Sequence, residues 1–551
     1  MRTSATRLQG DVPRPRRRRA AAYRHVVGLL LGSTSVVFAA GCGDAKTSAT
    51  AGKSAMIINM VRTPHSLDPA NQCDAADPLA GNLYSRLVQF GTKPGPDGTL
   101  QSDQTKLEPD LARSWDVSHD GRTYTFHLRS GAKFGSGRPV DAEAVVYNFD
   151  RVQKMGVCSA FAVSTADNGN VRSVRALDPT TVQIKLRRPN SSLIRSWATP
   201  SLGIVDPSVV EAHGGVVAGK PNEYLATHDA GSGPFIIKRY QPNQSLVLVS
   251  NPTYYGPKPK TTQLTVNFVS ADSTLQLQAS NGTADVTIGL SKQGYNSLRS
   301  NSKVRRVAYT ARTTEQVVLN WDKAPFDQVL VRRAVATAVP YDALISKVTF
   351  GLGKAFYGPI LPGMPFYNAP LSQPLATDIA KAKDLIQQSG VKTPIPVTLV
   401  IDQGNQVHEQ LATLLQDTWN QIGLKVSIRK LDQAAYTDTL FGNKAQATLR
   451  TDFPFVDDPD YYLGYDLQCQ KGAENTGHIC VPSIDRALLR ARRALSDGDK
   501  QHAYDEVTRL WRDNAPKVFL YLEQDTVVLS RRVGSFTFDP TLSSFAQLGA
   551  K

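Results

Sequence analysis

Residues 107–134 read Leu107-Glu-Pro-Asp-Leu-Ala-Arg-Ser-Trp-Asp-Val-Ser-His-Asp-Gly-Arg-Thr-Tyr-Thr-Phe-His-Leu-Arg-Ser-Gly-Ala-Lys-Phe134, and this stretch says most about the fold. Within it, Thr123–Leu128 alternates between polar and apolar side chains, which predicts a half-buried β-strand. The segment Asp141–Val152 predicts a helix, because its apolar side chains fall on one face: Ala142, Val145, Val146 and Phe149. Strand-like and helix-like segments of this kind alternate along the chain from Ala55 onward.

The second half of the chain contains a helix–strand–helix–strand unit. It consists of a helix ending at Gly390, a strand at Pro396–Ile401, a helix ending at Gly423 and a strand at Lys425–Ile428. Earlier strands are expected at Ala55–Val61 and Ser245–Val249. Such alternation favours an α/β fold in which helices cover a parallel sheet.

The N-terminus has the layout of an export signal. Arginines crowd residues 14–24, an apolar segment spans Val26–Ala40, and Ala39-Ala40-Gly41-Cys42 follows. The apolar segment is about 15 residues long, shorter than the roughly 20 that a membrane-spanning helix needs. The pattern resembles a lipoprotein signal, which implies that residues 1–41 are removed and that a lipid on Cys42 anchors the protein to the outer face of the cell membrane.

Residues 42–54 are small and polar, and they predict a flexible tether after the signal. Two alternatives to the lipoprotein signal stay open at this point. The segment is either an ordinary signal peptide that is cut elsewhere or an N-terminal membrane anchor.

The formal charge of +15 does not indicate nucleic-acid binding. Eight arginines and one aspartate give residues 1–41 a charge of +7, which leaves +8 for the rest. That surplus is spread without a basic run comparable to Arg16–Arg19, so it suits a globular domain near an anionic membrane or wall. We expect no nucleic-acid partner.

Five cysteines suggest a disulfide framework. Removing Cys42 for the lipid leaves Cys73, Cys158, Cys469 and Cys480, an even number in an exported chain. Cys469 and Cys480 are close in sequence and are expected to pair. Cys73 and Cys158 form either a second disulfide or two buried free thiols.

The quoted stretch closely resembles the "P-x-L-A-x-S-W … D-G-x-T-Y-T-F-x-L-R-x-G-x-K-F" segment of family 5 solute-binding proteins, the dipeptide, oligopeptide and nickel receptors of ABC importers. Further segments match the family in order along the chain: Gly137–Val145, Gly231–Ile237, Asn251–Gly256, Asn281–Val286, Asn320–Leu344 with Pro325-Phe326, Gly358–Gly363 and Asp458-Pro459-Asp460. The resemblance covers roughly residues 55–530, and the order of these seven further segments makes it specific.

The resemblance implies a two-lobed α/β fold of the periplasmic-binding-protein type II, with a hinge and a ligand enclosed between the lobes. The first lobe is expected to be discontinuous, holding residues 55–310 and the returning segment 519–551. The second lobe is expected to hold residues 311–518. Clefts between lobes are a preferred place for ligands, and hinge closure is a common switching move in such proteins.

The resemblance also implies a carboxylate in the second lobe that holds a peptide's α-amino group, and Asp452 matches that position best. A buried ammonium needs such a partner, because its desolvation is otherwise very costly. Here Arg450-Thr451 replaces the family's tryptophan, and the segment before Asp458-Pro459 is longer than usual, so a turn-capping role for Asp452 stays open. Arg450 either pairs with Asp452 or meets a ligand carboxylate. Thr451 and Phe453 flank Asp452 and are included in the predicted ligand site.

Three further residues complete the predicted ligand site. Asn320 and Trp321 follow a strand at Val317–Leu319, where Trp321 either stacks on the ligand or packs against the hinge. His65 follows the first strand near the expected mouth of the cleft, where a lone histidine is more often structural.

The sequence contains no complete enzyme motif that we recognise. His408-Glu409 begins a zinc-protease pattern, but residue 412 is Ala, so the second ligand is absent. We expect no catalytic residue, metal or cofactor. The predicted function is capture of di- or oligopeptides by a monomeric, lipid-anchored protein and delivery to an ABC permease. The alternatives are a metal chelate, opine or oligosaccharide on the same scaffold, or a secreted enzyme or surface adhesin.

Overall fold

A computed structural model describes residues 55–71, 79–157, 159–160, 162, 170–469, 475–539 and 545–551. The predicted signal, tether, lipidation site at Cys42 and pairing of Cys73 with Cys158 lie outside these residues. Among the residues that are described, no helix combines the length and the apolar character needed to cross a membrane.

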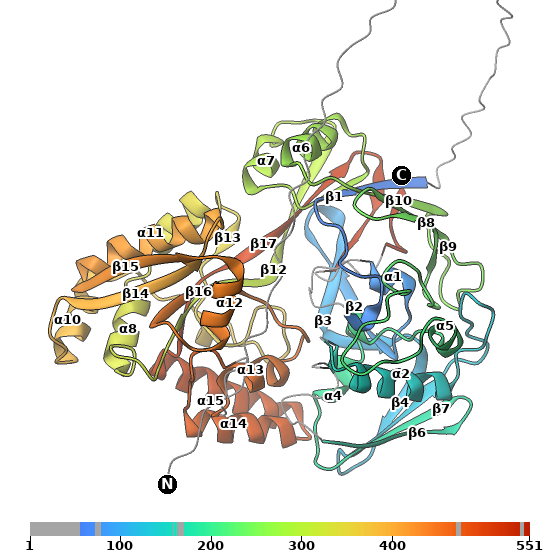
Figure 1. The fold of residues 1–551 in the computed structure, drawn as a ribbon, viewed down its shortest axis with the longest axis horizontal. Helices are drawn as coiled ribbons and strands as arrows, with labels where there is room; N and C mark the ends of the chain where they lie inside the picture. Colours follow the sequence, from blue (N-terminus) through green and yellow to red (C-terminus); the bar gives the residue numbers. More distant parts are fainter. Residues whose placement is uncertain are drawn as a thin grey trace, which may run out of the picture. The chain divides into compact units, whose positions relative to one another are not determined.

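The described strands include an eleven-stranded mixed sheet (Figure 1). Ten strands follow one another across it in the order β15 (Leu424–Leu431), β14 (Ile395–Asp402), β16 (Ala447–Asp452), β12 (Val304–Leu319), β17 (Lys517–Ser530), β11 (Val286–Ile288), β1 (Ala55–Met60), β10 (Gln263–Phe268), β9 (Ser245–Ser250) and β8 (Phe235–Gln241). The eleventh, β13 (Gly353–Lys354), pairs with β17.

The long antiparallel strands β12 and β17 connect two hydrophobic cores (Figure 1). Tyr309 of β12 and Val527 of β17 belong to a core with β1 and β10, whereas Val317 and Leu522 belong to a core with β14 and the helices around it. The pairing register shifts between Thr310 and Thr314, between the two cores. The chain therefore crosses between the two cores twice, in the paired strands β12 and β17. Two adjacent crossings of this kind are suited to act as a hinge.

We call the elements on the β1 side of this crossing the first lobe and those on the β14 side the second lobe. The sequence predicted that the chain returns to the first lobe at residue 519. Residues 519–522 are buried in the core of the second lobe. We therefore propose that the return lies between Leu522 and Val527.

The second lobe contains the predicted helix–strand unit. β14 pairs in parallel with both β15 and β16, as expected, but β16 pairs antiparallel with β12, so the sheet is mixed rather than parallel. Asn405 caps the N-terminus of α11, whose buried face includes Leu411, Leu415 and Trp419. The longer helices of this lobe are α8 (Val329–Thr337), α10 (Ile379–Gln388), α11 (Gln406–Gln421), α12 (Gln433–Phe441), α13 (Pro459–Leu467), α14 (Pro482–Arg493) and α15 (Asp497–Asn514).

The first lobe adds smaller sheets to its part of the large one. Four antiparallel strands form one of them, in the order β4 (Ala112–Val117), β5 (Thr123–Leu128), β7 (Thr181–Leu186) and β6 (Val171–Asp178). The predicted strand at 123–128 is β5, with its apolar residues buried in alternation. The predicted helix is α2 (Ala142–Met155), which Asp141 caps through a 2.9 Å hydrogen bond from the Ala144 amide.

Other short elements complete the first lobe. The strands are β2 (Val88–Pro94), β3 (Leu100–Pro109) and β19 (Thr537–Phe538) in one sheet, and β18 (Val533–Ser535) with β20 (Gly549–Ala550) in another. The helices are α1 (Ala80–Leu83), α4 (Leu193–Ser196), α5 (Pro207–Ala212), α6 (Asp272–Asn281) and α7 (Lys292–Ser297). In the second lobe, α9 (Tyr341–Ala343) is equally short.

The predicted disulfide between Cys469 and Cys480 is present, between the end of α13 and the start of α14. We predict that replacing both cysteines by serine lowers the free energy of unfolding by about 3 kcal/mol, because the bridge restricts the unfolded chain. Denaturant unfolding with and without reductant measures the effect. A reductant should destabilise the wild type and leave the double variant unchanged; a wild type indifferent to reductant would contradict the prediction.

Candidate functional site

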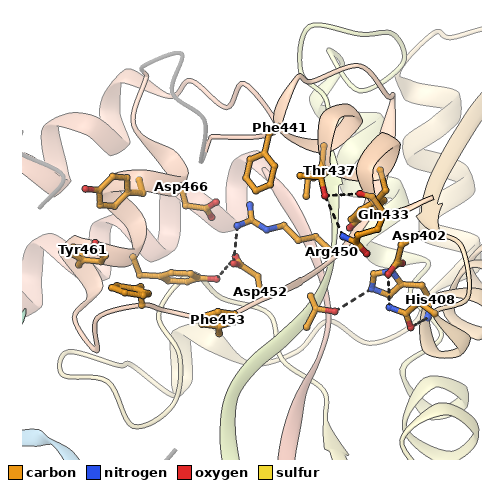
Figure 2. A pocket seen from close by; sticks show the side chains of 17 residues that line it. Asp402, His408, Gln433, Thr437, Phe441, Arg450, Asp452, Phe453, Tyr461 and Asp466 are labelled. Atoms are coloured by element: carbon orange, nitrogen blue, oxygen red, sulfur yellow. Dashed lines mark hydrogen bonds and ion pairs between the residues drawn. The ribbon is translucent and has the colours of Figure 1, made fainter. Parts of the chain in front are cut away.

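A cavity of about 490 Å³ lies in the second lobe at the carboxyl ends of two parallel strands (Figure 2). Asp402 is the last residue of β14 and Asp452 is the last residue of β16. In α/β sheets, ligands bind at the carboxyl ends of strands, so this edge is the expected place for a site. The lining comes from β14, α11, β16, α13 and α12, together with the segment after Asp452.

Asp452 is buried and holds three partners inside the protein. Its Oδ1 lies 3.1 Å from Nη2 of Arg450, and its Oδ2 accepts hydrogen bonds from Nε2 of Gln316 at 2.7 Å and from the Tyr462 hydroxyl at 3.1 Å. Burial alone would raise the pKa of Asp452, but the charges of Arg450 and Lys517 and the two hydrogen bonds hold that pKa below its ordinary value. Asp452 is therefore an anion already neutralised by Arg450.

A second buried ion pair lies behind the first. Lys517, the first residue of β17, pairs with Asp466 of α13, and both residues are buried. Burial and the nearby Asp452 raise the pKa of Asp466 despite the opposing charges of Lys517 and Arg450. Two carboxylates and two cations thus balance at this end of the cavity.

His408 of α11 forms the centre of a polar network at the other end of the cavity. Its Nδ1 contacts Oδ1 of Asp402, and its Nε2 lies 3.2 Å from Oε2 of Glu315 on β12. The Thr451 hydroxyl donates to Oε1 of Glu315 at 2.8 Å. Burial lowers the pKa of His408, but the hydrogen bonds and charges of Glu315 and Asp402 outweigh it, so the pKa is raised. The two carboxylates thus favour the charged form of His408.

Aromatic rings make up much of the remaining wall. The Arg450 guanidinium lies 5.8 Å from the centre of the Phe441 ring, within reach of a cation–π contact. The aromatic lining residues are Tyr436, Phe441, Phe453, Phe455, Tyr461, Tyr462 and Tyr465. A mostly apolar wall with a few fixed polar groups is typical of small-molecule sites.

The structure brings together four of the residues predicted from the sequence. Arg450, Thr451, Asp452 and Phe453 all line the cavity, and Figure 2 shows Arg450 directed at Asp452. Their contact with a ligand stays a prediction.

The other three predicted residues do not line the cavity. Nδ2 of Asn320 donates to the carbonyl groups of Asn443 and Ala445, at 3.0 and 2.8 Å. Trp321 lies under the guanidinium of Arg332, 3.6 Å from its ring centre, and is packed against the core of the second lobe. His65 is exposed. In this structure Asn320 and Trp321 therefore support the fold rather than the cavity wall.

The sequence reasoning missed the network around His408. His408 was considered only as a zinc ligand, although Asp402 at the end of a predicted parallel strand was a signal that could have been used. Glu315, two residues before the apolar run Val317–Leu319, was a second signal, because a carboxylate buried beside such a strand requires a partner. Within the described residues, no group of three or more His, Cys, Asp or Glu side chains is arranged to hold a metal ion.

Comparison with known proteins places this geometry in context. Residues 106–474 match the model of a family described as bacterial extracellular solute-binding proteins, family 5 Middle. A probable D,D-dipeptide-binding periplasmic protein of Escherichia coli K12 is 30% identical over 493 residues, which cover 89% of this chain and 92% of the relative.

Several solved structures with this fold hold ligands, and two of them are relevant to the solute. A periplasmic binding protein from Helicobacter pylori, in complex with the peptide STSA, has a TM-score of 0.73 and 22% identity over 90% of this chain and 98% of its own. A Campylobacter jejuni protein in complex with Ni(L-His) has a TM-score of 0.73 and 18% identity over 90% of this chain and 100% of its own. The two-lobed α/β fold of the periplasmic binding proteins is thus confirmed.

We predict that His408 makes the stability of the protein depend on pH. Because the folded pKa of His408 is raised, the stabilisation it gives is fully present below its unfolded pKa of about 6.5 and is lost as pH rises through the folded value. His408→Gln should lower the free energy of unfolding at pH 6 more than at pH 9, and denaturant unfolding at several pH values measures this.

The control is His502→Gln, which changes an exposed histidine on α15. Its unfolding free energy should follow that of the wild type. A difference between wild type and His408→Gln that stays constant from pH 6 to pH 9 would show that His408 is not held in its charged form.

Proposed function

Because the chain belongs to family 5 of the bacterial extracellular solute-binding proteins, we propose that it captures small peptides and delivers them to the permease of an ABC importer. Members of this family bind solutes for transport and are not enzymes. The E. coli relative named for D,D-dipeptides and the H. pylori structure holding STSA both favour a peptide as the solute.

The observation that carries the proposal is the buried carboxylate of Asp452 in the wall of a peptide-sized cavity. Its volume of about 490 Å³ lies within the range of roughly 300 to 1,000 Å³ that is usual for small-molecule sites. A peptide brings an ammonium group, and an ammonium that leaves water needs a carboxylate partner. Asp452 stays anionic at neutral pH, since its pKa is held low.

Binding of an ammonium at Asp452 requires an exchange of partners. Arg450 occupies Oδ1 of Asp452, while Gln316 and Tyr462 occupy Oδ2. We propose that the ligand ammonium replaces Arg450 at Oδ1 and that the freed guanidinium turns toward a ligand carboxylate or carbonyl. Gln316 and Tyr462 would keep the carboxylate oriented during this exchange.

We predict that Asp452→Asn weakens binding of a free dipeptide by roughly 30-fold to a few thousand-fold. This corresponds to about 2–5 kcal/mol for truncating one partner of a buried charge pair, at about 1.4 kcal/mol per tenfold change. N-acetylation of the same dipeptide should weaken its binding to the wild type for the same reason. Calorimetry on both proteins, starting with D-alanyl-D-alanine and L-alanyl-L-alanine, measures both effects.

The acetylated peptide makes the test independent of folding, because the Asn variant also leaves Arg450 without its carboxylate. Asp438→Asn is the matched control, since Asp438 pairs with Lys444 on the surface of the same lobe. Indifference of the wild type to N-acetylation would exclude Asp452 as the ammonium partner.

The aromatic wall favours a second candidate, a non-peptide solute on the same scaffold. Seven aromatic side chains line the cavity, and such rings stack on flat or cyclic ligands. An opine, an oligosaccharide or a metal chelate, such as the Ni(L-His) of the C. jejuni protein, would use this wall. Tight binding of such a solute without binding of any peptide would select this candidate.

We also propose that the protein is exported and is held at the outer face of the cell membrane by a lipid on Cys42. The support is the sequence of the N-terminus: the arginine-rich segment, the short apolar core and Ala39-Ala40-Gly41-Cys42. Family members are described as extracellular, which agrees with export.

We predict that Cys42→Ala releases the protein from the membrane fraction or leaves it as an unprocessed precursor without lipid. Cell fractionation with mass spectrometry of the N-terminus measures this, and Cys42→Ser serves as a second variant. A wild-type protein that carries no lipid, or a variant that stays processed and membrane-bound, would refute the anchor.

A further inference from the structure

The segment that joins β16 to α13, together with the first turn of α13, carries three buried carboxylates, and each faces a buried arginine from a different part of the chain. The segment reads Phe453-Pro-Phe-Val-Asp-Asp-Pro-Asp460. All six charged residues of these pairs are at most 9% exposed: Asp457 with Arg312, Asp458 with Arg195, and Asp460 with Arg492. Arg492 lies on α14, so its pair is internal to the second lobe, whereas the other two pairs reach beyond it.

Arg195 of α4 links this segment to the first lobe. Its Nε donates to the Asp457 carbonyl at 2.8 Å and lies 3.3 Å from Oδ2 of Asp458. Its Nη2 donates to the carbonyl of Gln104 on β3, and its guanidinium lies 5.1 Å from the ring centre of Phe90 on β2. One guanidinium thus connects β2 and β3 with residues 457–458.

Arg312 links the same segment to the hinge. It lies on β12 between Thr310 and Thr314, where the pairing with β17 shifts register. Its Nη1 forms an ion pair with Oδ1 of Asp457. Because both partners are buried, removing either leaves an uncompensated buried charge, which is strongly destabilising. The position of residue 457 is therefore fixed by the hinge strand as well as by the first lobe.

The segment has one side in the cavity and one side in the first lobe. Phe453 and Phe455 line the cavity beside Asp452. Val456, the next residue, is buried in the core of the first lobe that contains β5 and α2. A movement of the segment would therefore change the cavity wall and the contact between the lobes together.

We propose that Arg195 and Arg312 are positioning residues that hold segment 453–458 across both lobes and thereby keep the cavity wall at Phe453 and Phe455 in place. Contact between the lobes then raises ligand affinity, because apparent affinity scales with the fraction of molecules in which the wall is formed. The link to affinity rests on the proposed ligand capture, whereas the positioning itself does not.

Asp458→Asn is the most selective variant for the test. Asp458 caps α13 through the Asp460 amide at 2.9 Å, and asparagine caps helices as well as aspartate does, so the variant removes the charge facing Arg195 and keeps the cap. Hydrogen exchange of the ligand-free protein, followed by mass spectrometry, should show at least tenfold faster exchange in residues 453–458. Exchange in β14 and β9 should be unchanged.

Arg195→Met is the second variant, and Glu506→Gln is the matched control. Glu506 forms a surface ion pair with Arg490, between α14 and α15, so its loss removes an exposed ion pair away from the segment. The control should leave exchange in residues 453–458 unchanged. With D-alanyl-D-alanine, or whichever dipeptide the wild type binds, Asp458→Asn should also speed dissociation about tenfold or more.

Three results would overturn the inference: unchanged exchange in residues 453–458 in both variants, faster exchange spread evenly over the chain, or unchanged dissociation of a bound dipeptide. If no peptide binds the wild type, the proposed function fails, and exchange in the ligand-free protein still decides whether Arg195 positions the segment.

Discussion

A charged side chain that is buried needs a partner of opposite charge, and the architecture around the site depends on this constraint. Asp457, Asp458 and Asp460 are all buried within four residues, and an unpaired carboxylate in such a place costs several kcal/mol. The chain meets this need with arginines from α4, β12 and α14; Arg195 on α4 lies 262 residues before Asp457 in the sequence. These ion pairs therefore connect the first lobe and the hinge strand β12 with the wall of the cavity.

The same constraint shapes the cavity itself. At one end Asp452 and Asp466 are balanced by Arg450 and Lys517, while at the other His408 is shared by Asp402 and Glu315. Asp452 is paired with Arg450, so an ammonium that binds at Asp452 has to exchange with Arg450 rather than meet a bare anion. Such an exchange favours ligands that carry both charges, because a freed guanidinium also needs a partner. A zwitterionic peptide satisfies both needs at once.

Local patterns in the sequence predicted the elements well, because they depend on neighbouring residues. The strand at 123–128 and the helix–strand unit of the second lobe follow from periodicity, capping and glycine positions. The resemblance to a known family added the two lobes and pointed to Asp452. The mixed character of the large sheet was not predictable from alternation alone, because it depends on how β12 and β17 return through the lobes.

Clusters of residues that lie far apart in the sequence could not be predicted from such local patterns. His408 and Glu315 are 93 residues apart on different elements, and no local pattern places them together. Asn320 and Trp321 follow a strand, as the sequence predicts, but they do not line the cavity. The Asn320 side chain bonds to a neighbouring loop, and Trp321 packs against Arg332. Arg195 showed no signal, since its carboxylate partner Asp458 belongs to the other lobe.

The central claim is that the cavity beside Asp452 receives a peptide with a free amino group. Native mass spectrometry of the protein purified gently from its source or expression host tests it most directly, because bound ligand is released and identified without a prior guess. The account predicts adducts whose fragments are those of short peptides with unmodified N-termini, lost on dialysis against denaturant and regained on refolding with peptide. Adducts with the mass of a metal chelate, an opine or a sugar, and no adduct on incubation with dipeptides, would contradict it.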